Sequence, residues 1–207
     1  MPLSAHEVNH LKQAPFVEGV LPAILSRWSP RSFSDREVGK ADLARVFEAA
    51  RWAASSSNEQ PWRFLVGVRN SGTHSKLAAT LVSFNQAWAP HAPVLILGTA
   101  ATKFAKNGRP NGYAQHDLGQ ATAYLLLQAT ALGLAAHPMA GYDHDAARLS
   151  LDIPEDYALG ALIALGYQGE PAALADEKLL AQEVAPRTRK PLEEIAFSSW
   201  GTPFERI

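Results

Sequence analysis

A proline places three polar side chains of one short segment on the same side of the chain. The segment reads Ser-Arg-Trp-Ser-Pro-Arg-Ser-Phe over residues 26–33. Because Pro30 favours extended backbone in the residue before it, and alternate side chains of extended chain share a face, Arg27, Ser29 and Arg31 should point the same way. Two guanidinium groups and a hydroxyl that converge suit an anion, above all a phosphate or the polar edge of a heterocycle. The sequence therefore predicts an anion site here.

A second segment near the C-terminus has the same pattern. It reads Pro-Arg-Thr-Arg-Lys-Pro over residues 186–191, and its prolines again favour extended chain. Arg187 and Arg189 should then share one face and form a second anion clamp. Arginines are exposed by default, so charges on a surface turn and on a solvated tail are the alternative interpretations of the two segments.

A polar loop lies between two apolar elements in the first third of the chain. Residues 53–64 read Ala-Ala-Ser-Ser-Ser-Asn-Glu-Gln-Pro-Trp-Arg-Phe, and a run of three serines and an asparagine cannot build an apolar core. These side chains favour caps and turns over continued helix. A loop this rich in hydrogen-bonding groups, held between a helix and a strand, is expected to hold a ligand. The alternative is a helix C-terminal loop capped by its own hydroxyl groups.

The composition excludes several classes of site and protein. The chain of 207 residues has no cysteine, which rules out disulfides, thiolate metal sites and a cysteine nucleophile. Redox chemistry would therefore need a cofactor. A formal net charge of -1 gives no reason to expect nucleic acid as a partner. The sequence has no Gly-x-Ser-x-Gly elbow, Gly-x-Gly-x-x-Gly loop or P-loop, which argues against a hydrolase, a Rossmann fold and nucleotide hydrolysis.

The polar residues predict neither a metal site nor a catalytic dyad. The seven histidines are scattered and lack metal-ligand spacing. His116 adjoins Asp117, and His144 adjoins Asp145, but neighbours in sequence do not share a helix face. We therefore expect no catalytic side chain and no metal ligand.

The chain is expected to be cytoplasmic and to form one domain over residues 1–207, with a C-terminal extension from about residue 185. The N-terminus lacks the layout of a signal peptide. No apolar run approaches the ~20 residues that span a bilayer, so no membrane partner is expected.

Hydrophobic periodicity predicts alternating helices and strands. Helices are expected at residues 17–25, 42–54, 73–84, 117–132 and 144–151, and strands at residues 62–68, 93–98, 134–139 and 158–167. The helix at 117–132 is apolar most of the way round, which predicts a central helix covered on several sides, including by a second subunit. Residues 103–115 are rich in chain breakers and are expected to form a lid. The last part of the chain has little periodicity and is expected to be an irregular tail.

Taken in order, several segments resemble the motifs of the FMN-dependent nitroreductase family. They are residues 27–33, 52–62, 84–85, 117–119, 138–143 and 186–189. The resemblance implies an α+β fold in which a central mixed β-sheet is flanked by helices. It also implies an intertwined homodimer with two flavin sites at the dimer interface.

The resemblance further assigns roles in FMN binding. The phosphate and ribityl chain would be held by Arg27, Ser29, Arg187 and Arg189. Arg31 would lie near the pyrimidine end of the ring, and Asn85 would also contact the ring. The serine-rich loop would reach the flavin of the neighbouring subunit. The segment that begins at residue 138 would line the opposite ring face, with the N–H of Ala140 directed at the reactive nitrogen. The residues implied for the cofactor are Arg27, Trp28, Ser29, Arg31, Ala54, Ser55, Ser56, Asn58, Asn85, Pro138, Met139, Ala140, Gly141, Arg187 and Arg189.

Two positions depart from the family pattern. Some members carry an acidic residue where this chain has Ala140, and a basic residue near the position of Trp88. If only the backbone of residue 140 matters, its function is retained. Trp88 in place of a cation removes one flavin contact.

The implied function is an FMN-dependent NAD(P)H oxidoreductase that reduces nitroaromatic, quinone or similar electron-poor acceptors in a two-stage, ping-pong cycle. The flavin would carry the chemistry, and Arg31 would stabilise negative charge on the reduced ring. One alternative is a flavin-binding or flavin-sensing protein without turnover. Another is a specialised flavin enzyme, such as a dehalogenase, a heterocycle dehydrogenase or a flavin-fragmenting enzyme.

Overall fold

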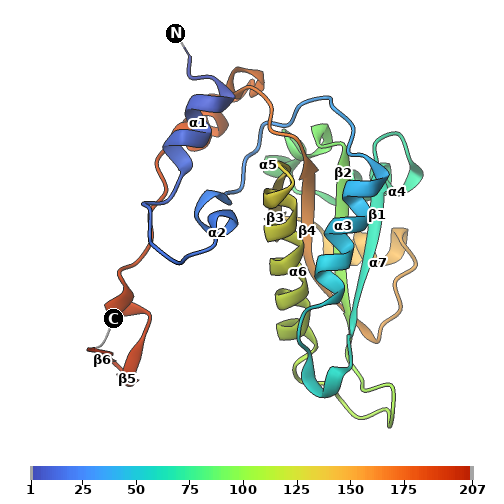
Figure 1. The fold of residues 1–207 in the computed structure, drawn as a ribbon. Helices are drawn as coiled ribbons and strands as arrows, with labels where there is room; N and C mark the ends of the chain where they lie inside the picture. Colours follow the sequence, from blue (N-terminus) through green and yellow to red (C-terminus); the bar gives the residue numbers. More distant parts are fainter. Residues whose placement is uncertain (1, 206–207) are drawn as a thin grey trace.

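A four-stranded β-sheet with helices on both faces forms the body of the protein (Figure 1). The structure is a computed structural model and describes residues 2–205. The strand order is β1-β2-β4-β3, with strands β1 (Trp62–Val68), β2 (Val94–Ala101), β4 (Tyr157–Gly166) and β3 (Ala135–Met139). The mixture of helices and sheet confirms the α+β class.

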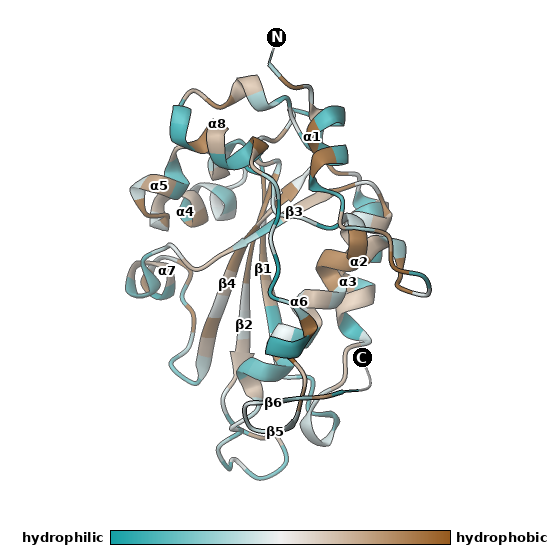
Figure 2. Ribbon diagram, turned by 90° about the vertical axis from the view of Figure 1, so that its left-hand side faces the viewer, coloured by the Kyte–Doolittle hydropathy of each residue, from teal (hydrophilic) through white to brown (hydrophobic). Residues whose placement is uncertain are grey.

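Each face of the sheet has its own apolar core. On one face, α6 (Ala114–Ala131) packs against β2 and α3 (Lys40–Arg51) packs against α6, with Val46, Leu125 and Ile163 fully buried. On the other face, α4 (Gly72–Thr80) and α7 (His144–Ser150) cover Leu95 and Leu162. In Figure 2 the strands between these helices carry hydrophobic colours, whereas α7 is largely hydrophilic on its outer side. Within residues 2–205 no helix is long and apolar enough to cross a membrane.

The sheet within one chain is antiparallel, which corrects the expectation of a mixed sheet. The pairs β1–β2, β2–β4 and β3–β4 are all antiparallel. Alternating helices and strands usually produce parallel neighbours, because the helix crosses the sheet between them. Here the connection through α4 starts and ends at the same end of the sheet, since Val68 pairs with Val94. Helix α6 does cross the sheet, but β4 lies between the two strands that α6 connects.

The long helix and all four strands were predicted to within a few residues. Helix α6 begins three positions before the predicted start, and its predicted stripe at Leu118, Ala121, Leu125 and Ala129 is buried. Strand β1 has the predicted bounds. The predicted helix at 73–84 is instead two helices, α4 and α5 (Ser83–Gln86). The chain is extended at Leu81 because this residue bridges to Tyr142 and the N–H of Val82 donates to the carbonyl of Gly141.

Both ends of the chain differ from the sequence predictions. The helix predicted at 17–25 is only α2 (Pro22–Ser26), because Gly19 adopts φ +80° in a turn; Pro22 occupies the first helical turn, as expected. The C-terminal part contains α8 (Glu177–Val184), which was predicted as irregular tail. Its N-cap is Asp176, whose carboxylate accepts from the N–H of Leu179.

Helix α8 packs against α1 (Ala5–Lys12), and the chain then continues as an arm that leaves the body (Figure 1). The arm, residues 185–205, carries a small hairpin of β5 (Phe197–Ser199) and β6 (Thr202–Pro203). The side chain of Trp200 at the hairpin tip is 98% exposed. The arm therefore presents apolar side chains that find no cover in the same chain.

Gly67 tests how tightly α4 packs on the sheet. A Cβ at this position would lie 2.5 Å from the Cα of His74 and would also clash with the N atom of His74. We expect Gly67→Ala to lower the free energy of unfolding by about 1–3 kcal/mol, the usual cost of overpacking. Gly72→Ala is the matched control, because nothing lies within 4 Å of its Cβ position; its effect should stay within about 0.5 kcal/mol. Urea unfolding measures both, and equal effects would contradict the close packing.

Candidate functional site

The first arginine segment has the alternation that its proline predicts. Arg27, Ser29 and Arg31 are half-buried, whereas Trp28, Pro30 and Ser32 are buried. An Nη1 atom of Arg27 donates to the Oγ of Ser29 at 3.2 Å, so these two side chains do converge. The prediction of a shared face is confirmed for this pair, and Trp28 is a packing residue whose Nε1 donates to Asn9 at 2.8 Å.

The second arginine segment lies against the first. Arg187 donates to the backbone carbonyls of Leu25 (2.6 Å) and Arg27 (2.5 Å). Arg189 is exposed and close enough to lower the pKa of Arg27, after burial, which is the larger cause. The pKa of Arg187 is also lowered, first by burial and then by Arg189 and Arg27. The two segments, 160 residues apart in sequence, thus form one cationic cluster of three guanidinium groups.

This cluster has no carboxylate to balance it. Among the ion pairs of residues 2–205, none includes Arg27, Arg187 or Arg189. Arg187 differs from its predicted role, because two of its nitrogen atoms are bound to backbone carbonyls and hold the two segments together. Arg27 and Arg189 keep most of their N–H groups for a ligand. Buried or half-buried cations need a counter-charge, so this cluster favours an anion.

Arg31 lies apart from this cluster, under α5. Its guanidinium carbon is 5.8 Å from the ring centroid of Phe84 and 5.9 Å from that of Trp88. Its Nε is buried without a hydrogen-bond partner. A buried N–H without an acceptor costs free energy, which an acceptor atom of a bound ligand would recover.

His137, which precedes Pro138 on β3, was not predicted as a site residue. Its Nδ1 lies 3.0 Å from the carbonyl of Pro30, and its ring is 4.6 Å from that of Trp88. Burial, with a smaller contribution from the charges of Arg31 and Arg27, lowers the pKa of His137 to about 4. The imidazole is therefore neutral at pH 7 and fixes the backbone between the two arginines. No local pattern marks such a histidine, because its partners come from a distant segment.

Trp88, one of the two positions that depart from the family pattern, is a core residue. It is 1% exposed and lies 6.4 Å from Phe33 in a stacked arrangement. The side chain therefore packs beneath Arg31 and does not extend into an open site.

The segment after β3 meets Asn85. The Nδ2 of Asn85 donates to the carbonyl of Gly141 at 3.0 Å, and a Cβ at Gly141 would lie only 2.6 Å from that nitrogen. Met139 points into the core and is 6% exposed, whereas Ala140 is exposed. Of Pro138, Met139, Ala140 and Gly141, only Met139 has its side chain committed to packing, so its backbone alone is available to a ligand.

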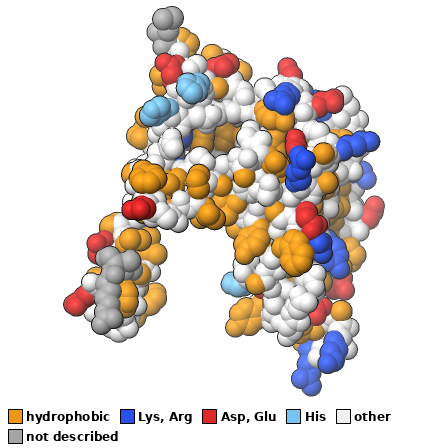
Figure 3. Space-filling view, in the orientation of Figure 1, with side chains coloured by type: hydrophobic (Ala, Val, Ile, Leu, Met, Phe, Trp, Pro, Cys, Tyr) orange, Lys and Arg blue, Asp and Glu red, His pale blue; other side chains and the backbone are white. Residues whose placement is uncertain are grey.

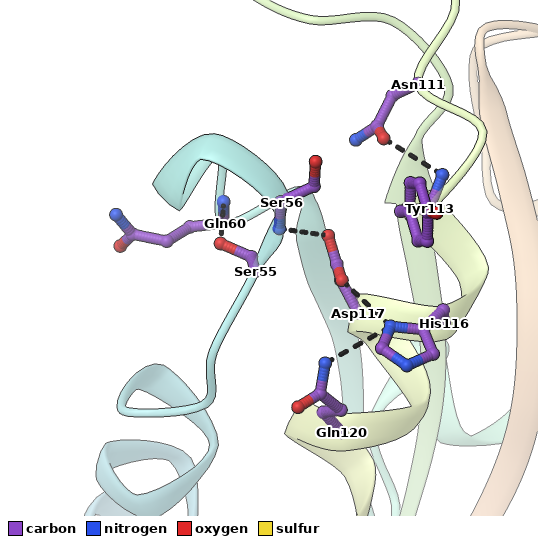
Figure 4. Close-up of polar contacts among 8 residues, drawn as sticks. All are labelled: Ser55, Ser56, Gln60, Asn111, Tyr113, His116, Asp117 and Gln120. Carbon is purple, nitrogen blue, oxygen red and sulfur yellow. Dashed lines mark hydrogen bonds and ion pairs between the residues drawn. The ribbon is translucent and has the colours of Figure 1, made fainter.

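The serine-rich loop is strained and anchored. Ser57, Asn58 and Gln60 all have positive φ (54°, 56° and 50°). Two contacts hold this shape: the N–H of Ser56 donates to an Oδ of Asp117 at 2.9 Å, and the Oγ of Ser55 accepts from the N–H of Gln60 at 3.0 Å (Figure 4). Strained backbone held by tertiary contacts is common where a ligand is bound. Ala54 and Asn58 are exposed, and the Oδ1 of Asn58 accepts from the Nε2 of Gln60 at 3.2 Å.

His116 contacts Asp117, and the sequence did not predict this contact. The Nδ1 of His116 lies 3.2 Å from the second Oδ of Asp117, and Gln120 approaches the same nitrogen (Figure 4). Neighbours do not share a helix face, but in the first turn of α6 the exposed imidazole can bend back to the buried carboxylate. Asp117 therefore connects the serine-rich loop to the start of α6.

The serine-rich loop and the arginine cluster of one chain do not meet. Figure 1 places the loop at the far end of α3, away from α2 and the start of the arm. Within residues 2–205 no hydrogen bond or ion pair joins residues 53–60 to either arginine segment. The structure thus brings together the arginines, Ser29, Asn85 and Gly141 in one region, and leaves Ala54, Ser55, Ser56 and Asn58 in another.

Comparison with known proteins identifies the family. The family described as Nitroreductase family matches residues 24–81 and 68–167. The chain belongs to the nitroreductase family.

Individual relatives support this assignment. An Archaeoglobus fulgidus protein, provisionally named NADH dehydrogenase/NAD(P)H nitroreductase, is 33% identical over 155 residues, which cover 73% of this chain and 86% of the relative. A crystal structure of an oxidoreductase containing FMN matches with a TM-score of 0.83 and 34% identity, over 90% of this chain and 94% of that chain. A Desulfovibrio desulfuricans structure in complex with FMN matches with a TM-score of 0.70 and 27% identity, over 91% and 99%.

The chemistry of this nitroreductase-family chain fits FMN. The phosphate of FMN would balance the positive charge of the arginine cluster. Its pyrimidine edge has acceptor atoms that could bind the Nε of Arg31, which has no hydrogen-bond partner. The contact with Asn85 requires a glycine at residue 141, because a Cβ there would lie 2.6 Å from the Asn85 Nδ2.

The neutral state of His137 predicts a pH-dependent difference in stability. Its folded pKa of about 4 lies below the ordinary histidine value of 6.5, so between these values only the unfolded chain takes up the proton. The resulting stability loss below pH 6.5 is at most about 3 kcal/mol, and it is complete once pH falls through the folded pKa. Urea unfolding at pH 7 and pH 4.5 should show a smaller loss in His137→Gln than in wild type. His91→Gln, an exposed control, should behave as wild type; an unchanged loss in His137→Gln would contradict the assignment.

Proposed function

We propose that the protein is an FMN-dependent NAD(P)H oxidoreductase that reduces electron-poor acceptors such as nitroaromatics and quinones. The observation that carries the proposal is the cluster of Arg27, Arg187 and Arg189 without a carboxylate, together with Arg31, whose buried Nε lacks an acceptor. The FMN content of related structures and the names of relatives support the same cofactor and a nicotinamide donor.

The residues of this chain would bind and orient the cofactor. Arg27 and Arg189 would hold the phosphate, while Arg187 keeps their segments in contact. Arg31 would lie at the pyrimidine edge and stabilise negative charge there, because its guanidinium is fixed and half-buried. The backbone from Pro138 to Gly141 would line one ring face. Bound FMN itself supplies the hydride chemistry.

A second copy of the chain would complete each site, making the protein a homodimer. Support for a dimer comes from the separation between the serine-rich loop and the arginines, because the two groups of residues proposed to bind FMN lie in different regions of one chain. Apolar side chains are also exposed on the arm and on the body, and a second copy of the chain would bury them (Figure 3). Those on the arm include Leu192, Ile195 and Trp200, and Trp52 on the body is 71% exposed beside a groove between α3 and α6.

Donor and acceptor would use the same open ring face in turn, which is the basis of the proposed ping-pong cycle. The exposed Tyr113 and the half-buried Phe104 of the lid are candidates for this face, since neither side chain belongs to the buried core. The lid itself is held by a bridge between Lys103 and Pro110.

The cofactor and the donor are tested on the purified protein. We expect a flavin absorption spectrum, release of FMN on denaturation, and bleaching when NADH or NADPH is added without oxygen. Bleaching that reverses on addition of a quinone would establish both stages. A protein that stays colourless after incubation with FMN would contradict the proposal, whereas bound FMN that is not bleached would favour a flavin-binding protein without turnover.

Arg31→Ala tests the role assigned to this guanidinium. Loss of a charge-assisted hydrogen bond costs about 1.5–3 kcal/mol, so FMN affinity should fall about 10- to 100-fold. Arg31→Lys, which keeps the charge, should lose less. Lys76→Ala, an exposed change on α4, is the control. Titration with FMN, followed by fluorescence quenching, measures all three, and wild-type affinity together with a wild-type reduction rate in Arg31→Ala would disprove the role.

A further inference from the structure

A fully buried carboxylate holds the backbone of the first arginine segment. Glu183, on α8, is 0% exposed. Its two oxygens accept from the N–H of Arg31 at 3.1 and 2.9 Å, and one of them also accepts from the N–H of Ser32 at 3.2 Å. No comparison or sequence motif assigned a role to this residue. A buried charge is costly unless it is paired and hydrogen-bonded, so its position needs an explanation.

Two cations face this carboxylate. The charges of Arg31 and Lys12 both act on Glu183, and together with the two amides they oppose the rise in its pKa that burial causes. Lys12 is 5% exposed and lies over the Trp28 ring at 4.9 Å. Its Nζ donates to the carbonyls of Gln182 (3.1 Å) and Ala185 at the C-terminal end of α8. Cations are favourable at this end of a helix.

The same part of the tail contacts the first segment a second time through Arg187. Glu183 accepts from the amides of Arg31 and Ser32. Arg187, four residues further on, donates to the carbonyls of Leu25 and Arg27. Together these contacts form a clasp, by which we mean Glu183 and Arg187 with the backbone of residues 25–32. The clasp sets the position of Arg31 relative to Arg27 and Arg189.

We infer that Glu183 is a positioning residue that joins the two arginine segments into one anion site and tempers the positive charge beside the flavin ring. Only the effect on the charge beside the flavin ring rests on the proposed function. The contacts of the clasp are made within the chain and do not depend on a flavin. Glu183 is the only carboxylate in residues 2–205 that acts on Arg31, so it determines how much of the Arg31 charge a ligand experiences.

Glu183→Gln separates position from charge. Glutamine has one carbonyl oxygen in place of two, so the amides of Arg31 and Ser32 should exchange with solvent faster, at least about tenfold for a loss near 1.4 kcal/mol. Hydrogen exchange on the FMN-free protein measures this without any enzyme activity. Removal of the negative charge should also raise the two-electron potential of bound FMN, because reduction adds negative charge to the ring. A tenfold change in the ratio of oxidised to reduced binding corresponds to about 30 mV for a two-electron couple.

Three further variants complete the test. Glu177→Gln makes the same charge change on an exposed position of α8 and should leave both readouts at wild-type values. If Glu183→Gln does not fold, Glu183→Asp should still speed amide exchange, and Lys12→Gln should lower the potential because it removes a positive charge. The inference is overturned if exchange at both amides, or the potential, stays at the wild-type value. A wild-type protein that binds no FMN would instead contradict the proposed function, while the exchange experiment would still decide the role of the clasp.

Discussion

The arrangement of positive charge without a counter-charge is the constraint on which the rest of this site depends. Arg27, Arg187 and Arg189 act on one another, and burial together with mutual repulsion lowers the pKa of Arg27. Such a cluster costs free energy in the empty protein and is stabilised when an anion binds. The backbone carbonyls that accept from Arg187 offset part of this cost, and they also explain why the tail lies against α2. The fold thus holds the arginines close together before a phosphate binds.

The sheet and its helices place the other contacts around this charge. Strand β3 brings His137 to the carbonyl of Pro30, and the turn after β3 brings Gly141 to Asn85 on α5. The break between α4 and α5 makes this possible, because extended residues at 81–82 pair with residues 141–142. At the other end of α3, Asp117 holds the serine-rich loop in a conformation with positive φ angles. The proposed function requires these two ends to meet in a pair of chains.

Local patterns in the sequence predicted the elements but not the contacts between distant segments. The strands follow from apolar runs, and the alternation from Trp28 to Arg31 follows from the effect of one proline on its neighbour. The antiparallel order could not be read this way, because a helix in a connection does not reveal whether it crosses the sheet. Helix α8 was missed because only Leu179 is deeply buried among its apolar residues and the flanking prolines suggested irregular chain.

The polar residues that were missed have the same explanation. His137 and Glu183 look ordinary in the sequence, and their importance arises from partners 107 and 152 residues away. Arg187 was predicted to share a face with Arg189, but its guanidinium binds the carbonyls of Leu25 and Arg27, which no local rule could identify. Conversely, the rule that neighbours do not share a helix face did not predict the contact between His116 and Asp117 at the first turn of α6.

The most direct test of the account is whether one site is built from two chains. One variant would lack arginines (Arg27→Ala with Arg189→Ala), and the other would carry an altered loop (Ser55→Ala with Asn58→Asp). Dimers with one chain of each kind, isolated through two affinity tags, contain one unaltered arginine cluster that faces one unaltered loop. The account predicts that each variant alone loses FMN, while the mixed dimer binds one FMN per dimer. A mixed dimer that binds none, or a monomer that binds FMN as tightly as wild type, would contradict it.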